Sequence, residues 1–170
     1  MDAYLFASMQ YAAQMHGWTQ FVSMQNLYTM VWREEEFEMN AFCEQTGVGL
    51  TPWAPLAGGF LAADWRKTAN RHSERARSAS SCSTKTYGTS EDYRVFDGLV
   101  DVSVRLRVAP VQLALAWLLT RPAISSPIVG ATKLPQLDDA LAALEWTLCA
   151  VDLRVLTDAY TPVRRLDLLR

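Results

Sequence analysis

The sequence predicts an α/β fold with parallel strands, and three observations support this prediction. Three short apolar runs, residues 21–25, 48–52 and 126–130, have the length and composition of buried strands. Stretches with helical periodicity separate them, which is typical of parallel pairing through right-handed crossovers. Strands that are apolar throughout need cover on both faces, as in a barrel or a doubly wound sheet. A complete (β/α)8 barrel takes about 250 residues, so this chain of 170 is too short to close one.

The first half of the chain is expected to contain two helices around the first two strands. One helix covers residues 2–15 and ends at Gly17, which suits a left-handed cap. The side chains expected near one face of this helix are Leu5, Met9, Ala12 and His16. The second helix begins at the acidic residues 34–36, which favour the positive end of a helix dipole, and ends at Gly47.

The second half begins with a segment of different character. Residues 64–90 are rich in Ser, Arg and Lys and lack periodicity, so we expect a long mobile loop there. Such a loop could cover a bound cofactor as a lid, or it could have no function. Ser90 is expected to start an amphipathic helix, and Pro110 to start another that ends before Pro122.

Two further helices are expected near the carboxyl terminus. Pro135 opens the first of them, and the second covers residues 152–160. The leucines at helical spacing after Pro135 are expected to be core residues: Leu137, Leu141 and Leu144.

Composition and charge exclude several classes of protein. Half of the residues are hydrophobic, 20% are charged and the net charge is −2. This composition excludes an intrinsically disordered chain, and the charge provides no basic field for nucleic acid or an acidic membrane. No apolar run approaches the length of a membrane span. We therefore expect a single cytoplasmic unit over residues 1–170, without nucleic-acid or membrane partners.

The cysteines and histidines argue against disulfides and metal chemistry. The three cysteines are far apart and odd in number, which favours a reducing compartment. The two histidines, His16 and His72, have no metal-ligand spacing, so no metal site is expected.

Four segments resemble the aldo-keto reductases, in particular the fungal and bacterial aryl-alcohol-dehydrogenase type. The segments are 23–28 (SMQNLY), 33–36 (REEE), 47–59 (GVGLTPWAPLAGG) and 126–133 (SPIVGATK). They occur in the family's order and cover nearly all of the chain. The resemblance implies a (β/α)8 TIM barrel that binds NADP(H) and reduces aldehydes or ketones. The match begins after the family's first half, so it implies the carboxyl-terminal half of such a barrel, with parallel strands and outer helices.

The resemblance implies cofactor contacts at two strand ends. Gln25 corresponds to a glutamine that hydrogen-bonds the nicotinamide carboxamide, and Trp53 to an aromatic residue that stacks under the nicotinamide ring. Ala54, Leu56 and Gly58 lie in the loop that approaches the pyrophosphate, where backbone N–H groups and the absence of a glycine side chain would matter. The alternative interpretations are that Trp53 is a core tryptophan and that the loop is a plain turn.

A second group of cofactor contacts is implied around the last predicted strand. Gly130, Thr132 and Lys133 precede a helix, as at the phosphate site of a barrel. Lys133 would meet the 2′-phosphate and favour NADP over NAD. Gln136 and Asp139 match positions that contact the adenosine end. Without the resemblance, Lys133 could be an ordinary surface lysine.

The resemblance also implies that the catalytic machinery is absent. The family's tetrad of Asp, Tyr, Lys and His lies in the half that this chain does not match, so no catalytic residue is assigned. Tyr87 is followed by Gly88, as in the family's catalytic segment, but Cys82 stands where the required Asp would be. We therefore expect Tyr87 to be a solvated loop residue.

The function that follows is that of an NADP(H)-dependent aldo-keto reductase acting on a small carbonyl substrate, truncated without its tetrad. Two alternatives stay open. One is a non-catalytic half-barrel that binds nucleotide or a partner chain, since unpaired strand edges favour self-association. The other is an inactive remnant.

Overall fold

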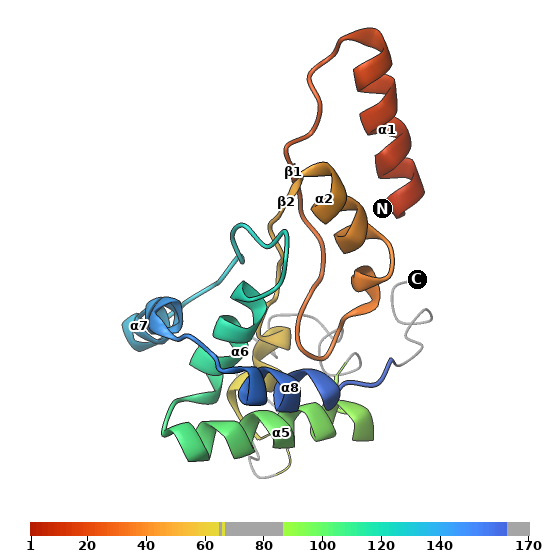
Figure 1. Ribbon diagram of the computed structural model, residues 1–170. Coiled ribbons are helices and arrows are strands. Elements are labelled where there is room, and N and C mark those ends of the chain that lie inside the picture. Colours follow the sequence, from red (N-terminus) through yellow and green to blue (C-terminus); the bar gives the residue numbers. More distant parts are fainter. Residues whose placement is uncertain (65, 67–86, 163–170) are drawn as a thin grey trace.

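The computed structural model describes residues 1–64, 66 and 87–162 (Figure 1). Most of the predicted loop 64–90 lies outside the described residues. The helices are α1 (Ala3–His16), α2 (Met39–Thr46), α5 (Ser90–Leu106), α6 (Pro110–Leu119), α7 (Leu134–Ala142) and α8 (Ala150–Asp158). The 3-10 helices are η1 (Glu34–Glu36), η2 (Ala57–Ala62) and η3 (Ala143–Glu145).

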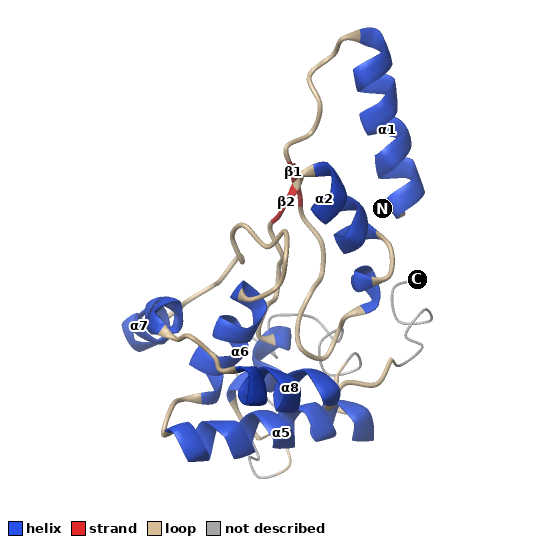
Figure 2. Ribbon diagram, viewed as in Figure 1, coloured by secondary structure: helices blue, strands red, loops and turns tan. Residues whose placement is uncertain are grey.

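The strands are parallel, as predicted, but much shorter than the apolar runs that contain them (Figure 2). β1 (Ser23–Met24) pairs with β2 (Gly49–Leu50), and Ser23 lies opposite Gly49. The α/β class with parallel pairing is therefore confirmed for the described residues.

The third predicted strand contributes only isolated bridges. Ile124 pairs in parallel with Leu50, and Ile128 with Trp53. Pro127 lies between these bridges and has no N–H to donate, which interrupts a ladder. The segment nevertheless lies beside β2, so the described order is β1, β2 and then residues 124–128.

The residues before β1 are exposed, which contradicts the prediction of a buried strand at 21–25. Phe21 is 50% exposed and Val22 is 79% exposed. β1 is an edge of the two-stranded sheet, with β2 on one side. The apolar run therefore correctly located a strand, but burial requires a neighbouring element that the described residues do not supply.

A small apolar cluster joins α1 and α2 to the strands. Its buried residues are Phe6, Met39, Cys43, Val48 and Leu50. In Figure 1, α1 extends away from the rest of the fold beside α2. Both helices end at glycines in the left-handed conformation, Gly17 and Gly47, as the sequence predicted.

The buried face of α1 differs from the predicted one. Phe6, Gln10 and Ala13 are buried, whereas Leu5 and Met9 are exposed. The amide of Gln10 donates to the carbonyl of residue 21 and accepts from its N–H, both at 2.8 Å. A hydrogen-bonded polar side chain therefore lies on the packed face together with Phe6 and Ala13, which a hydrophobic pattern alone does not predict.

The larger core lies between η2, α5, α6, α8 and the buried residues that follow β1. Its largest fully buried side chains include Trp117, Tyr28 and Phe60. Thr89 and Asp92 form a capping box at the start of α5, so this helix begins at Ser90 as predicted. α5 and α8 lie side by side (Figure 1). Within the described ranges no single helix has the length and apolar composition to cross a membrane; α5 and α6 meet these criteria only jointly and are bent by 106°.

Tyr87 belongs to this core, which contradicts the prediction of a solvated loop residue. It is 8% exposed, and its ring stacks near that of Phe60 with 6.3 Å between centroids. Sequence context placed Tyr87 in a polar segment, but Phe60 provides a buried aromatic partner for it.

α7 lies at the periphery and packs beside α6 (Figure 1). All nine residues of α7 are described and none of them is buried. The leucines predicted to be core are exposed, Leu137 by 44%, Leu141 by 54% and Leu144 by 67%. Their spacing correctly predicted an amphipathic helix, but no described element covers the apolar face.

Candidate functional site

Backbone hydrogen bonds bring the carboxyl ends of three parallel segments together. The N–H of Trp53 donates to the carbonyl of Asn26 at 2.9 Å, and the N–H of Ile128 donates to the carbonyl of Pro52 at 2.8 Å. Trp53 also forms parallel bridges with Leu27 and Ile128. Trp53 therefore lies in the middle of a shared edge, with residues 25–27 on one side and residues 128–130 on the other.

Two of the predicted cofactor residues lie on this edge with accessible side chains. Gln25 is exposed and immediately follows β1. Trp53 is 43% exposed, so it is not the core tryptophan that was the alternative interpretation. An accessible indole can provide a stacking surface for a planar ligand, and an accessible amide can provide a hydrogen-bonding group.

The loop after Trp53 has an unusual backbone. Ala54 and Ala57 have φ values of 51° and 52°, and Gly58 and Gly59 have φ values of 65° and 97°. Left-handed conformations cost about 1–2 kcal/mol for a residue with a Cβ, but not for glycine. The side chain of Leu56 packs against the larger core. The loop is thus held by its side chains while its backbone bends sharply next to Trp53.

The second predicted group lies at the start of α7. Gly130, Thr132 and Lys133 are exposed. The Oε1 atom of Gln136 accepts from the N–H of Thr132 at 2.8 Å and from the N–H of Lys133 at 3.3 Å. Gln136 therefore satisfies backbone donors that a helix N-terminus otherwise leaves open.

Asp139 has a partner on a different helix. Its Oδ1 accepts a hydrogen bond from Gln112 Nε2 at 2.8 Å, and Gln112 Oε1 accepts from the indole N–H of Trp146 at 3.2 Å. Gln112 belongs to α6, and Trp146 follows η3. The residue predicted at the adenosine end is thus attached to the body of the fold.

The predicted cofactor residues fall into two groups that the chain connects directly. Gln25, Trp53, Ala54, Leu56 and Gly58 lie at or after the first two strand ends. Residues 128–130 then lead from the bridge with Trp53 into the segment before α7. The accessible indole and the glycine-containing loop beside it have the chemistry that a nicotinamide nucleotide would require, a stacking surface and a backbone that can approach a phosphate closely.

Among residues 1–64, 66 and 87–162, no group of three or more His, Cys, Asp or Glu side chains could hold a metal ion. Two cavities of about 220 and 280 Å³ lie elsewhere, one between α1, α2 and the start of β1, the other between the end of η2 and α5.

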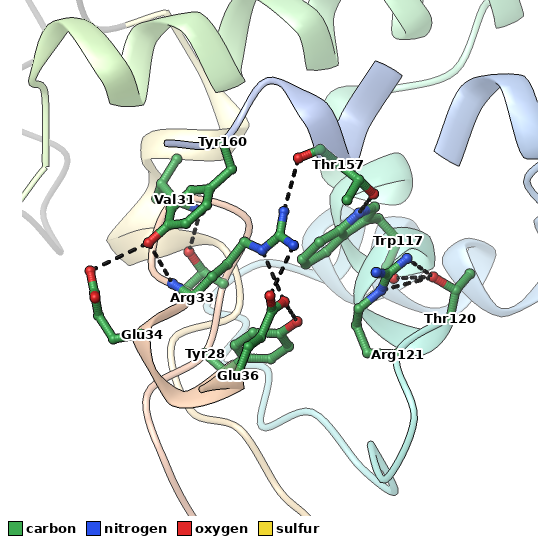
Figure 3. A network of polar contacts seen from close by, with 11 residues as sticks. Tyr28, Val31, Arg33, Glu34, Glu36, Trp117, Thr120, Arg121, Thr157 and Tyr160 are labelled. Atoms are coloured by element: carbon green, nitrogen blue, oxygen red, sulfur yellow. Dashed lines mark hydrogen bonds and ion pairs between the residues drawn. The ribbon is translucent and has the colours of Figure 1, made fainter. Parts of the chain in front are cut away.

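A polar network that the sequence did not predict connects the segment after β1 with α6 and the end of α8 (Figure 3). The Arg33 guanidinium lies between the rings of Trp117 and Tyr160, at 5.2 and 4.9 Å from their centroids. It also donates to the carbonyl of Thr157 at 3.0 Å. This network fixes the segment after β1 to α6 and α8. Only the spacing of Arg33 and Glu36 could have suggested it.

Asn26 is a second residue that the sequence did not single out. It is 6% exposed and its Nδ2 donates to Asn40 Oδ1 at 2.8 Å. Its own Oδ1 is buried and has no hydrogen-bond partner within the described residues. A buried amide oxygen without a donor costs about 1–3 kcal/mol, so this end of β1 is not optimised for stability.

Known proteins provide an independent comparison for this α/β fold with converging strand ends. A family model described as "Aldo/keto reductase family" matches residues 3–160. An aldo-keto reductase of Fusarium vanettenii, NECHADRAFT_45914, is 39% identical over 95% of this chain and 43% of its own length. C977.14c of Schizosaccharomyces pombe, named as an aryl-alcohol dehydrogenase, is 37% identical over 96% of this chain and 45% of its own length.

A solved structure agrees with these relatives. The thermostable aldo-keto reductase Tm1743, crystallised with the inhibitor epalrestat, has a TM-score of 0.62 and 20% identity. The similarity covers 89% of this chain and 44% of that one. At 20% identity, this structural similarity is evidence about the fold alone.

The chain belongs to the aldo/keto reductase family. Members of this family are generally oxidoreductases that use nicotinamide cofactors. The resemblance drawn from residues 23–28, 33–36, 47–59 and 126–133 is therefore confirmed. The chain spans less than half the length of the two curated relatives described above.

Proposed function

We propose that this chain is the nicotinamide-nucleotide-binding part of an NADP(H)-dependent carbonyl reductase. Its architecture would be the carboxyl-terminal portion of a (β/α)8 barrel, and its cellular location the cytoplasm. The observation that carries the proposal is the accessible indole of Trp53 at the centre of the shared strand edge, 43% exposed and flanked by bridges to Leu27 and Ile128.

At the nicotinamide end, Trp53 would stack against the ring and Gln25 would hydrogen-bond the carboxamide. An aromatic side chain held by a backbone ladder loses little freedom on binding, which favours affinity. The sharply bent backbone from Ala54 to Gly58 would approach the pyrophosphate, where a Cβ-free position permits close contact.

At the other end, Lys133 would meet the 2′-phosphate of NADP, and Thr132 and Gly130 would line the same segment. Lys133 is exposed and precedes a helix whose N-terminus favours negative charge. Gln136 and Asp139 would contact the adenosine. For this contact, Gln136 would have to give up its hydrogen bonds with the N–H groups of Thr132 and Lys133.

When bound, the nicotinamide supplies a hydride for carbonyl reduction, and a separate acid must donate a proton. No residue of this chain is assigned that second role, because the family's tetrad finds no match here. General acid catalysis contributes about 10²–10⁴-fold. The purified chain should therefore bind nucleotide without reducing aromatic aldehydes, and Tyr87→Phe should change nothing in that assay.

Calorimetric titration with NADPH and NADH tests the proposal. We expect tighter binding of NADPH, and Lys133→Ala should abolish the preference, a change of about tenfold. Trp53→Ala should weaken the binding of NADPH and of NADH by the same factor, because both nucleotides carry the nicotinamide ring. Arg154→Ala removes an exposed cation on α8 and serves as the control. Absence of binding by the unmodified chain would refute the proposal.

A second candidate function is assembly with another chain through the open edge of the sheet. β1 is an edge strand, and the residues preceding it expose Phe21 and Val22. Exposed strand edges favour pairing with further chains. Under this proposal the chain is a non-catalytic half-barrel that binds a partner chain, whereas an inactive remnant would bind neither nucleotide nor partner.

A further inference from the structure

We propose that Gln112 is a positioning residue that holds α7, and with it the segment 130–139, against α6. The inference rests on the proposed nucleotide site, because that segment carries its phosphate and adenosine contacts. Nothing in the sequence motifs singles out Gln112, which belongs to the apolar helix α6.

The need for such a residue follows from the packing of α7. None of its nine residues is buried, and its leucines are exposed. Most helices are held in place by an apolar face against a core. The adjoining η3 provides a buried anchor, Ala143, at the carboxyl end of α7. The helix N-terminus, where Lys133 lies, has no comparable apolar anchor among the described residues.

The hydrogen bond from Gln112 to Asp139 attaches α7 to α6 at a point that lies closer to the helix N-terminus than the Ala143 anchor. Gln112 Nε2 donates to Asp139 Oδ1 at 2.8 Å, in the middle of α7. Gln112 Oε1 accepts from Trp146 Nε1 at 3.2 Å, just beyond η3. One side chain of α6 thus contacts both α7 and the residue after η3.

The two partners of Gln112 have fixed polarity. An indole N–H can only donate and an ionised carboxylate can only accept, so the side chain between them must accept at one atom and donate at another. An amide does both. Glutamate could accept from Trp146 but would repel Asp139, and leucine could do neither. The contacts also determine which amide atom is oxygen and which is nitrogen.

The consequence for nucleotide binding is specific to one end of the ligand. Loss of the Gln112–Asp139 bond should release α7. The proposed adenosine contacts lie on this helix and the proposed 2′-phosphate contact precedes it, so both should weaken. The nicotinamide end depends on Gln25 and Trp53, which the backbone ladder holds independently. A general loss of stability would instead weaken both ends together.

The test compares Gln112→Leu and Gln112→Glu with the unmodified chain, and Gln14→Leu on the exposed surface of α1 is the matched control. Hydrogen–deuterium exchange of the unliganded chain should show about tenfold faster exchange of the α7 amides in both Gln112 variants, with α5 unchanged. Unchanged exchange in α7, or equal acceleration throughout the chain, would overturn the inference.

Ligand fragments supply the second readout. Adenosine 2′,5′-bisphosphate should bind about tenfold more weakly to the Gln112 variants, while nicotinamide mononucleotide binding stays within about twofold. Equal losses for both fragments would refute a positioning role. If the unmodified chain binds neither fragment, the proposed function fails, and the exchange measurement still decides the role of Gln112.

A double variant identifies the route of the effect. If Gln112 acts through Asp139, Gln112→Leu combined with Asp139→Leu should accelerate α7 exchange no more than either single change. Additive acceleration would show that the two residues act separately, which contradicts the proposed contact.

Discussion

The Arg33 guanidinium and the Glu36 carboxylate form a two-point hydrogen-bonded ion pair, with Nε to Oε1 and Nη2 to Oε2 both at 2.9 Å (Figure 3). The Arg33 side chain is 10% exposed and that of Glu36 is 33% exposed. The hydroxyl of Tyr28 also donates to Glu36 Oε1. Burial first, and then this hydrogen bond to Glu36, raise the pKa of Tyr28 above its ordinary range, so the phenol remains protonated.

Glu36→Gln should destabilise the fold by about 1–3 kcal/mol, because it leaves a largely buried guanidinium without its charged partner. The measurement is urea unfolding followed by circular dichroism. Glu34→Gln is the control. Within this network, the Glu34 carboxylate accepts a single hydrogen bond, from the Tyr160 hydroxyl at 3.3 Å. We expect the control to change stability by less than about 0.5 kcal/mol. Equal losses in the two variants would show that the ion pair has no special role.

Asp152 should make stability depend on pH. The hydrogen bond from Arg105 is the main cause that lowers the pKa of this carboxyl below its ordinary value, and the Cys149 thiol adds a second hydrogen bond. A lowered pKa means that the ionised form stabilises the fold above the unfolded pKa near 4, and that this contribution is lost as the pH falls through the folded pKa. Asp152→Asn should therefore lower the thermal midpoint at pH 7, and the difference should shrink towards pH 3.

The exposed Asp158, on the same helix, gives the control substitution Asp158→Asn for that experiment. It should have little effect at either pH. If the thermal midpoint of Asp152→Asn lies below that of the unmodified chain by the same amount at pH 7 and at pH 3, the ionisation of Asp152 does not contribute to stability.

The open sheet edge should govern association. Val22→Lys places a charge beside β1, and lysine at a strand edge opposes pairing with another chain. If the chain self-associates through this edge, light scattering after size-exclusion chromatography should show a shift to monomer. Val104→Lys is a closely matched control, because Val104 on α5 is 73% exposed against 79% for Val22. Association that both changes disrupt equally, or that neither disrupts, would exclude the edge as the interface.

The two described cysteines should differ strongly in reactivity. Cys43 is fully buried, and its burial, reinforced by the nearby Glu35 carboxylate, raises the pKa of its thiol to about 11. Cys149 is exposed. The thiolate is the reactive form, so at pH 7.5 we expect alkylation of Cys43 to be at least about 100-fold slower. Peptide mass spectrometry separates the sites. Comparable rates in the native chain would show that the cluster between α1 and α2 is open.

Sequence alone located most of the elements and the family. The predicted start of the second helix was wrong, because Glu34–Glu36 form the separate 3-10 helix η1 and α2 begins only at Met39. Gly17 and Gly47 end their helices in the left-handed conformation, and Pro110 begins α6, because these residues act through their own backbone geometry. The motifs at the strand ends identified the family, because they carry the residue types that this family places there.

Tertiary structure decided which surfaces are covered, because burial depends on partners distant in the sequence. The leucines of α7 have core spacing but remain exposed, whereas Tyr87 lies in a polar segment and is buried against Phe60. Likewise Arg33 meets Tyr160, which is 127 positions away, and Gln112 meets Asp139. Local patterns specify the backbone of each element, but only the folded chain brings together donors and acceptors from separate elements.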